Sequence, residues 1–367
     1  MPKKVDKTFL ISFFALLISG LVIFISASLG IYARDNAKFT SIIFSQIFIG
    51  LFMGLIACFI VSKINYRYWR KFSFYIFLLS VGATLLVFIP GVGVSHGGAT
   101  RWIYIGNMSF QPLELLKIGY IIYWAAWIGE VKERIQTIRW GLLPFMIITG
   151  IVGVVLLLQP DTDSFVIIFS VGLGMYLVGG GKWRHIFSII IIGFIGVSAL
   201  FFMRPYLLDR LMTFINPADN PLTSGYQIQQ SLIAVGSGEL FGRGLGQSIQ
   251  KFKYLPESIG DAIFPIAAEE FGFIGGIIII FLFLFFISQG LKIGGGAPDS
   301  FSGLLVIGIA ILITIQSFIN IASMIGVIPL SGSPLIFFSQ GGTALFFTLA
   351  EIGMIINVSR SKKLLTS

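Results

Sequence analysis

Charged residues are scarce in this sequence of 367 residues: they make up 11% of it, against about a quarter in a typical soluble domain. Hydrophobic residues make up 56%, and the mean hydropathy is +0.94. So little charge cannot cover the surface of a globular protein of this size with polar groups. The composition therefore argues against a water-soluble fold and predicts an integral membrane protein.

Cysteine and histidine are almost absent. Cys58 is the single cysteine, so no disulfide can form within the chain. His96 and His185 lie far apart in the sequence, and neither has another histidine or a cysteine at the spacing of zinc ligands. These shortages exclude a disulfide-stapled scaffold and a zinc site built from histidine and cysteine.

Long apolar stretches dominate the rest of the chain. A helix needs about 20 mostly apolar residues to cross a bilayer, and ten stretches approach or exceed that length. They are residues 9–29, 40–62, 72–89, 113–129, 141–159, 164–180, 186–203, 264–289, 301–324 and 335–358. The first has no signal-peptide cleavage site, so we expect it to remain as a helix. We predict an all-α integral membrane protein with ten transmembrane helices in a single domain, 1–367.

The basic residues predict the orientation of these helices. The chain has a net charge of +9, but its lysines and arginines flank the apolar stretches, which is typical of the positive-inside rule and not of nucleic-acid binding. With the N-terminus in the cytoplasm, sixteen of them face inward, whereas the short outer segments hold only Arg34, Lys38 and Arg101. Both termini are then cytoplasmic, and no nucleic acid is expected as a partner.

Five segments face outward in this topology, and four of them are rich in glycine, proline and polar residues. They are 30–39, 90–112, 160–163, 204–263 and 325–334. The segment 204–263, between the seventh and eighth stretches, is much longer than an ordinary connection, so we predict a large extracytoplasmic loop with a function. Within it, 226–235 has the pattern of a short amphipathic helix. The glycine run 242–246 either cradles a phosphate through backbone N–H groups or forms a tight turn.

Ionisable residues inside or beside the apolar stretches are costly and therefore informative. Glu114 and Lys117 are three residues apart on one helical face, where an ion pair is either structural or lines a polar path. Asp161 and Asp163 form an Asp-x-Asp that either binds a divalent cation or caps the following helix. Asp261 stands where the large loop re-enters the bilayer, and partial desolvation there raises its basicity toward that of a general base.

At these residues the sequence resembles the SEDS family of shape, elongation, division and sporulation proteins, and most of all its division members. The resemblance covers nearly the whole chain. The matching segments are 98–103 (GATRWI), 111–117 (QPLELLK), 157–161 (LLQPD), 216–217 (NP), 224–227 (SGYQ), 242–248 (GRGLGQS), Lys251, 254–257 (YLPE), Asp261 and 269–272 (EEFG).

The resemblance implies a peptidoglycan glycosyltransferase that polymerises lipid II at the outer face of the bacterial cytoplasmic membrane. It also implies a class B penicillin-binding protein and other division-complex membrane proteins as partners, with a location at the division septum. The family's catalytic aspartate falls on Asp261. A sugar hydroxyl is a poor nucleophile and needs such a base, and one displacement inverts the anomeric carbon.

The leaving pyrophosphate requires positive charge. The candidates are Arg101, Lys117, Arg210, Arg243 and Lys251. Glu114 is expected to hold Lys117, Trp102 to line the sugar site, and Glu257 to bind substrate. No cofactor is implied with certainty, and a divalent cation held by Asp161 and Asp163 is the open alternative.

The sequence departs from the family pattern at three places. Ile259-Gly260 and Ala262 replace a His-Thr pair and a phenylalanine around Asp261, Asp163-Ser164 replaces Gly-Thr, and Gln340 replaces a tyrosine. We expect a divergent member that keeps its activity. A lipid II flippase, motivated by Glu114 and Lys117, and a non-catalytic scaffold of the division complex are the alternative functions.

Overall fold

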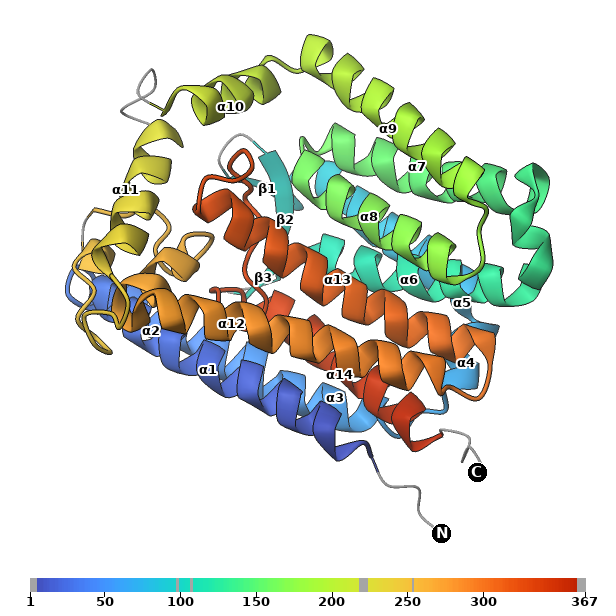
Figure 1. The fold of residues 1–367 in the computed structure, drawn as a ribbon, viewed down its shortest axis with the longest axis horizontal. Coiled ribbons are helices and arrows are strands. Elements are labelled where there is room, and N and C mark those ends of the chain that lie inside the picture. Colours follow the sequence, from blue (N-terminus) through green and yellow to red (C-terminus); the bar gives the residue numbers. More distant parts are fainter. Residues whose placement is uncertain (1–4, 97–98, 106–107, 218–223, 253, 362–367) are drawn as a thin grey trace.

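The computed structural model describes residues 5–96, 99–105, 108–217, 224–252 and 254–361. They form a bundle of long helices (Figure 1). The first half contains α1 (Lys7–Tyr32), α2 (Asn36–Ile43), the π-helix η1 (Phe44–Met53), α3 (Gly54–Val61), α4 (Tyr66–Lys71), α5 (Ser73–Leu85), η2 (Leu86–Phe88), α6 (Pro112–Val131), η3 (Lys132–Gln136), η4 (Ile138–Leu142), α7 (Leu143–Leu158) and α8 (Thr162–Val178). The second half contains α9 (Trp183–Met203), α10 (Pro205–Ile215), α11 (Ser224–Ser237), η6 (Gln250–Phe252), α12 (Ile263–Gly295), α13 (Ser300–Met324) and α14 (Gly342–Arg360).

Six helices in the described part of the chain are long and apolar enough to cross a membrane, so this is a multi-pass membrane protein. They are Lys7–Tyr32, Asn36–Val61, Ile138–Leu158, Ile263–Gly295, Ser300–Met324 and Gly342–Arg360. Three shorter apolar helices are Ser73–Phe88, Thr162–Val178 and Trp183–Ser198. The remaining predicted stretch, 113–129, lies in α6 with its two ionisable residues. Each of the ten stretches thus overlaps a helix, while ten crossings stay a prediction.

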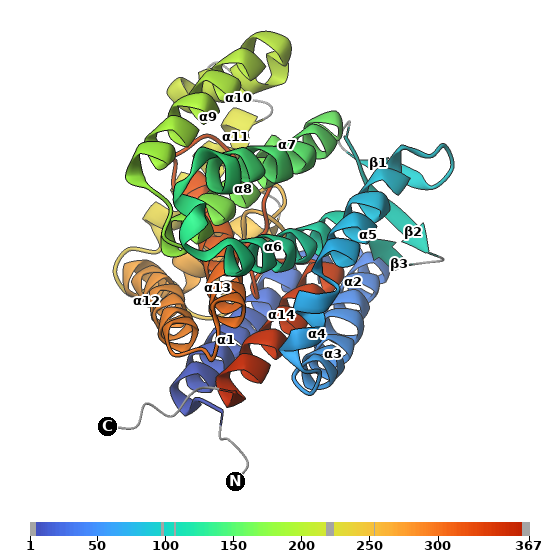
Figure 2. The same ribbon diagram turned by 90° about the vertical axis from the view of Figure 1, so that its right-hand side faces the viewer.

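Helix α13 lies at the centre of the bundle. It packs against α12, α6, α8 and α14, which surround it in Figure 2. Its side chains are apolar almost all round, and 83% of its most apolar window is buried. A helix with apolar residues on every face is expected in the interior, since no face of it is suited to water. Polar side chains on α13 are therefore placed to contact other parts of the protein.

Different segments of the chain lie at the two ends of the bundle. At one end, the Asp6 backbone N–H donates to Ser359 Oγ (3.0 Å), and the Tyr66 N–H donates to Asn357 Oδ1 (3.2 Å). The described chain therefore begins and ends side by side (Figure 1). At the opposite end, Arg34 donates to the Phe252 carbonyl oxygen. We call the first of these the terminal end and the second the loop end. An even number of crossings, such as the predicted ten, would bring the chain back to the end at which it begins.

A small sheet at the loop end corrects the all-α prediction. Strands β1 (Gly93–His96), β2 (Ala99–Ile105) and β3 (Met108–Phe110) pair antiparallel in that order, with Gly93 opposite Ile103 and Ile103 opposite Phe110. The aromatic and β-branched residues in 100–105 favour strands over helix. The predicted outer segment 90–112 is therefore structured, and the fold is mostly helical with one three-stranded sheet.

The last helix also begins later than predicted. Helix α14 starts at Gly342, whereas the apolar stretch starts at residue 335. Residues 335–341 are not helical, although 335–339 are buried, since Phe337 has a positive φ of 71° and the Leu335 N–H donates to Ser339 Oγ (2.9 Å). Apolarity alone could not reveal this, because a buried turn and a buried helix need equally apolar side chains.

Candidate functional site

Asp261 ends a tight turn at the loop end, directly before α12. The N–H groups of Gly260 and Ala262 donate to the Glu257 carbonyl oxygen (2.9 and 3.1 Å), and Glu257 itself has a positive φ of 48°. Asn320 Nδ2, from the C-terminal part of α13, donates to the Asp261 carbonyl oxygen (2.8 Å). The turn therefore rests on the most buried helix of the molecule, which fixes the position of its carboxylate.

The connection between α13 and α14, residues 325–341, packs against this turn. Asn320 Nδ2 also donates to the Ser333 carbonyl oxygen (2.7 Å), and Ser339 Oγ donates to the Gly260 carbonyl oxygen (2.7 Å). The Gln340 N–H donates to the Ile259 carbonyl oxygen (2.7 Å). Through these bonds Asn320 and the connection hold the Asp261 turn in place.

Gly332 lies beside two carboxylates. A Cβ atom at Gly332 would lie 3.6 Å from Asp261 Oδ2 and 3.9 Å from Asp163 Oδ2. The Gly332 N–H also donates to Asp163 Oδ2 (2.9 Å). Asp163 and Asp261, about a hundred positions apart in sequence, therefore face the same residue.

Arg210 of α10 pairs with Asp163. Its Nη1 donates to Oδ1 (3.2 Å) and Oδ2 (3.0 Å) of the carboxylate. The hydroxyl groups of Tyr206 and Thr162 share a second bond between the same two segments (2.7 Å). These contacts attach α10, which runs along the upper edge of the bundle in Figure 1, to the N-terminal end of α8.

Asp161 has a different partner. Its Oδ1 accepts from the Ser164 N–H (3.3 Å), which caps α8, and its Oδ2 lies 3.7 Å from Arg101 Nε. The Arg101 guanidinium also donates to the carbonyl oxygens of Gln159 and Pro160. The helix-capping alternative for Asp161 is confirmed. The two aspartates of the Asp-x-Asp turn to separate arginines, which does not fit a shared cation, and the described residues contain no group of three His, Cys, Asp or Glu side chains that could hold a metal ion.

Asp261 has the electrostatics of a base at neutral pH. Burial raises its pKa to about 7, with smaller increases from the carboxylates of Glu257 and Asp163, while the cations of Arg210 and Arg101 act in the opposite direction. Burial also raises the pKa of Asp161, against the effect of Arg101. A pKa near 7 suits a group that must accept a proton under physiological conditions.

Glu114 and Lys117 form the predicted ion pair below this site. Lys117 Nζ lies 2.7 Å from Glu114 Oε2 and donates to Gln316 Oε1 (3.0 Å), and both charged side chains are buried. Gln316 Nε2 in turn donates to the Pro334 carbonyl oxygen (3.2 Å). Through Gln316, the pair therefore supports the connection that holds Asp261.

Lys251 does not face the site. It is 1% exposed, and its Nζ lies 2.7 Å from Glu270 Oε1 and donates to Ser26 Oγ (3.2 Å). Arg243 pairs with the neighbouring Glu269 (3.4 Å). Both cations were candidates for the pyrophosphate, but their charges are used to join the large loop to α1 and α12, because buried carboxylates require partners.

The glycine run 242–246 is a turn packed on α12. The N–H groups of Arg243 and Gly244 donate to the carbonyl oxygens of Glu269 and Glu270 (3.0 and 2.9 Å). A Cβ at Gly242 would lie 2.2 Å from the Glu270 carbonyl oxygen, so only glycine fits. Since α12 occupies the N–H groups of Arg243 and Gly244, the structure favours the tight turn over the phosphate cradle.

Trp102 and Glu257 also lie at the loop end. Trp102 is half-buried on β2 opposite Val94, and Glu257 is exposed. Gln316, Asn320 and Gly332 were not predicted from the sequence. The signal for the first two was present, since a glutamine and an asparagine four residues apart interrupt the apolar stretch 301–324.

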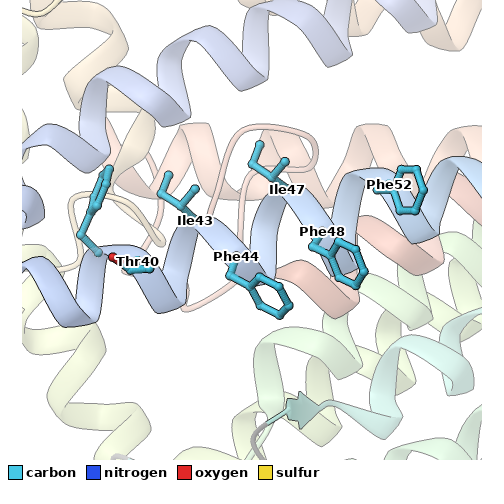
Figure 3. A pocket seen from close by; sticks show the side chains of 7 residues that line it. Thr40, Ile43, Phe44, Ile47, Phe48 and Phe52 are labelled. Carbon is cyan, nitrogen blue, oxygen red and sulfur yellow. The ribbon is translucent and has the colours of Figure 1, made fainter.

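A separate apolar groove follows α2 and η1 (Figure 3). It is lined by Phe39, Thr40, Ile43, Phe44, Ile47, Phe48 and Phe52. Phe44, Phe48 and Phe52 stack in sequence, with ring centroids 5.1 and 5.7 Å apart. This lining contains no acid, base or cation, so the groove cannot supply the chemistry of the Asp261 site.

The family model of the FtsW, RodA and SpoVE proteins, described as cell cycle protein, matches residues 7–364. The chain belongs to this family. The SEDS resemblance found in the motifs is thereby confirmed. The chain is 39% identical to stage V sporulation protein E of Bacillus subtilis (strain 168) over 84% of both proteins. It is 34% identical to a probable peptidoglycan glycosyltransferase FtsW of Trichlorobacter lovleyi over 98% of this chain and 94% of that protein.

Two solved structures share the SEDS fold described above. One is a chain from a study of the structural coordination of polymerization and crosslinking by a peptidoglycan synthase complex, with a TM-score of 0.80, 24% identity and coverage of 97% of this chain and 98% of that one. The other is rod shape determining protein RodA of Thermus thermophilus, with a TM-score of 0.70, 24% identity and coverage of 98% and 97%. At these identities the similarity shows the fold.

Proposed function

We infer that this SEDS protein is a peptidoglycan glycosyltransferase that polymerises lipid II into β-1,4-linked glycan strands. Two relatives with this activity in their names match over 84% and 98% of the chain. The observation that carries the chemistry is Asp261, whose pKa is raised to about 7 by burial and by neighbouring carboxylates. No other carboxylate at the loop end combines such a pKa with partial exposure in the described residues.

The proposed reaction has a simple proton balance. Asp261 accepts the proton of the acceptor sugar hydroxyl while that oxygen bonds to the donor's anomeric carbon and undecaprenyl pyrophosphate leaves. Arg210 and Arg101 are the cations whose charge reaches Asp261, so we assign them to the pyrophosphate side of the site. Trp102 and Glu257 remain candidates for binding the sugars.

We also propose the finer topology and setting. Ten helices cross the cytoplasmic membrane, both termini are cytoplasmic, and the loop end with segment 204–263 faces outward. This orientation presents Asp261 on the face where lipid-linked sugars are polymerised. A class B penicillin-binding protein and other division-complex membrane proteins are the proposed partners, and the division septum is the proposed location.

The test is polymerisation of labelled lipid II by the purified protein with its cognate penicillin-binding protein, whose transpeptidase is blocked. Asp261→Asn keeps the shape of the side chain and removes the base, so the rate should fall at least about a hundredfold. Asp209→Asn, an exposed carboxylate of α10, is the matched control and should stay active. Equal glycan synthesis by Asp261→Asn and wild type would exclude Asp261 as the base.

The flippase alternative rests on Glu114 and Lys117. The structure gives Lys117 two partners and buries the pair, which favours support of the site over a polar path. Lipid II translocation in sealed vesicles separates the two. If Glu114→Ala stopped translocation and left polymerisation on the outer face intact, the flippase would be favoured.

A further inference from the structure

Asp163 occupies a position where the SEDS pattern has glycine, and it lies at the site. Its carboxylate accepts from the Gly332 N–H (2.9 Å) and from Arg210 Nη1 (3.0 and 3.2 Å). Both carboxylates lie close to Gly332, since a Cβ atom there would be 3.9 Å from Asp163 Oδ2 and 3.6 Å from Asp261 Oδ2. A glycine at position 163 would offer neither bond, so both contacts depend on the residue that this chain carries.

The geometry of Arg210 leaves it able to bind an anion. Both bonds to Asp163 start from Nη1, whereas a guanidinium has five N–H groups in a planar fork. The side chain is 35% exposed, against 21% for Asp163, and the guanidinium lies 5.8 Å from the centre of the Tyr206 ring. Asp163 and Tyr206 thus orient the arginine from α8 and α10, while part of it stays accessible.

We propose that Asp163 is a positioning residue of the glycosyltransferase site, which holds Arg210 and the backbone of Gly332 beside Asp261 so that one cation faces the diphosphate of the donor. The proposal rests on the proposed function and goes beyond it, because the position is a glycine in the family pattern. Asp163 touches neither reacting atom, and it acts through Arg210 and Gly332.

The charges around Asp261 determine in which direction each substitution should shift the pH–rate profile. The groups that face Asp261 are the carboxylates of Glu257 and Asp163 and the cations of Arg210 and Arg101. Loss of the negative charge at position 163 favours the ionised form of Asp261, and loss of the positive charge of Arg210 disfavours it. The two substitutions therefore move the acidic limb of the pH–rate profile in opposite directions.

The experiment measures kcat and KM for labelled lipid II from pH 5 to 9 with the full-length protein and its penicillin-binding partner. In Asp163→Asn and Asp163→Gly we expect the acidic midpoint of kcat/KM to fall by about half a unit or more, with a loss of kcat/KM of about tenfold because Arg210 is no longer oriented. In Arg210→Gln the midpoint should rise. Asp163→Glu should restore the wild-type midpoint.

Asp209→Asn is the control for a lost carboxylate next to Arg210 in the sequence, and its midpoint should equal that of wild type. An unchanged midpoint in Asp163→Asn and Asp163→Gly, in protein that unfolds at the wild-type temperature, would overturn the proposal and leave Asp163 as a structural link between α8 and α10. The proposed function fails in a different way, since wild type would then make no glycan at any pH.

Discussion

Asp261 derives its basicity from its neighbours, so its activity should depend on pH in a defined way. Burial and the carboxylates of Glu257 and Asp163 raise its pKa to about 7. Only the ionised form can accept a proton, so the polymerisation rate should rise up to pH 7 and level off above it, with a loss of about tenfold per pH unit on the acidic side. Initial rates at saturating lipid II check this. A profile that is flat between pH 5 and 8 would contradict it.

Asp261 should also lower the stability of the folded protein at high pH, where its carboxyl group is ionised. Its folded-state pKa of about 7 lies above the ordinary value of 3.8 because of burial. Between these pH values the folded protein holds a proton that the unfolded chain has released, so stability falls as pH rises toward 7. Asp261→Asn removes this cost, whose upper limit is about 4 kcal/mol at pH 8.

Thermal unfolding in detergent checks this prediction. The gain in unfolding temperature for Asp261→Asn over wild type should be larger at pH 8 than at pH 5. Asp209→Asn should show no such difference. An equal gain at both pH values would mean that the raised pKa makes no contribution to stability.

The sequence revealed Asp261 and Arg210 but not the groups that hold them. Charged residues beside apolar stretches are conspicuous because burial of charge is costly. Asn320 and Gly332 act through an amide and a backbone N–H, and their role depends on which distant carbonyl or carboxylate they meet. Lys251 was predicted to bind the pyrophosphate but lies elsewhere. The spacing of residues in the sequence cannot reveal that its charge is neutralised by Glu270.

At the scale of elements, α12 contains a break that only glycine allows. Gly272 has φ 69° and ψ −168°, a region essentially restricted to glycine. A Cβ there would lie 2.3 Å from the Gly242 nitrogen and 2.5 Å from the Leu240 carbonyl oxygen. The break also lets the Phe273 N–H donate to the Glu239 carbonyl oxygen (2.8 Å). The large loop is therefore attached to α12 through this residue.

Gly272→Ala should destabilise the protein by about 3 kcal/mol or more, since strained backbone and overpacking each cost about 1–3 kcal/mol. Gly295→Ala is the matched control near the other end of α12, where no atom lies within 4 Å of the added Cβ. It should be neutral or slightly stabilising. The measurement is the unfolding temperature of both variants in detergent, and equal temperatures would show that the break is not required.

Hydropathy predicted the helices well and the irregular backbone poorly. The stretches 9–29 and 301–324 match α1 and α13 within a few residues, because a span must be apolar along its whole length. Residues 335–338 of the turn are equally apolar, and the strands between residues 93 and 110 lie in a segment rich in glycine and polar residues. Their conformations depend on packing against Asp261 and against each other, which composition does not encode.

At the scale of the molecule, the two ends of the bundle differ in chemistry. The loop end holds Asp261, Asp163 and Arg210, and the terminal end joins the N-terminal helix to α14. The positive-inside rule predicts that the terminal end is cytoplasmic. The family chemistry independently requires an outward-facing Asp261, so a single labelling experiment tests both.

Variants with one added cysteine can distinguish the two ends, because the native Cys58 is buried and should react slowly with an impermeant maleimide. Gln247 in the large loop and Gln136 in η3 are both exposed and carry the same side chain. In spheroplasts, Gln247→Cys should be labelled fully and Gln136→Cys only after the membrane is permeabilised. The reverse pattern would invert the orientation, and labelling of both from outside would contradict an arrangement in which η3 and the Asp261 loop lie on opposite faces. The expected pattern places the base on the side where lipid-linked sugars are polymerised.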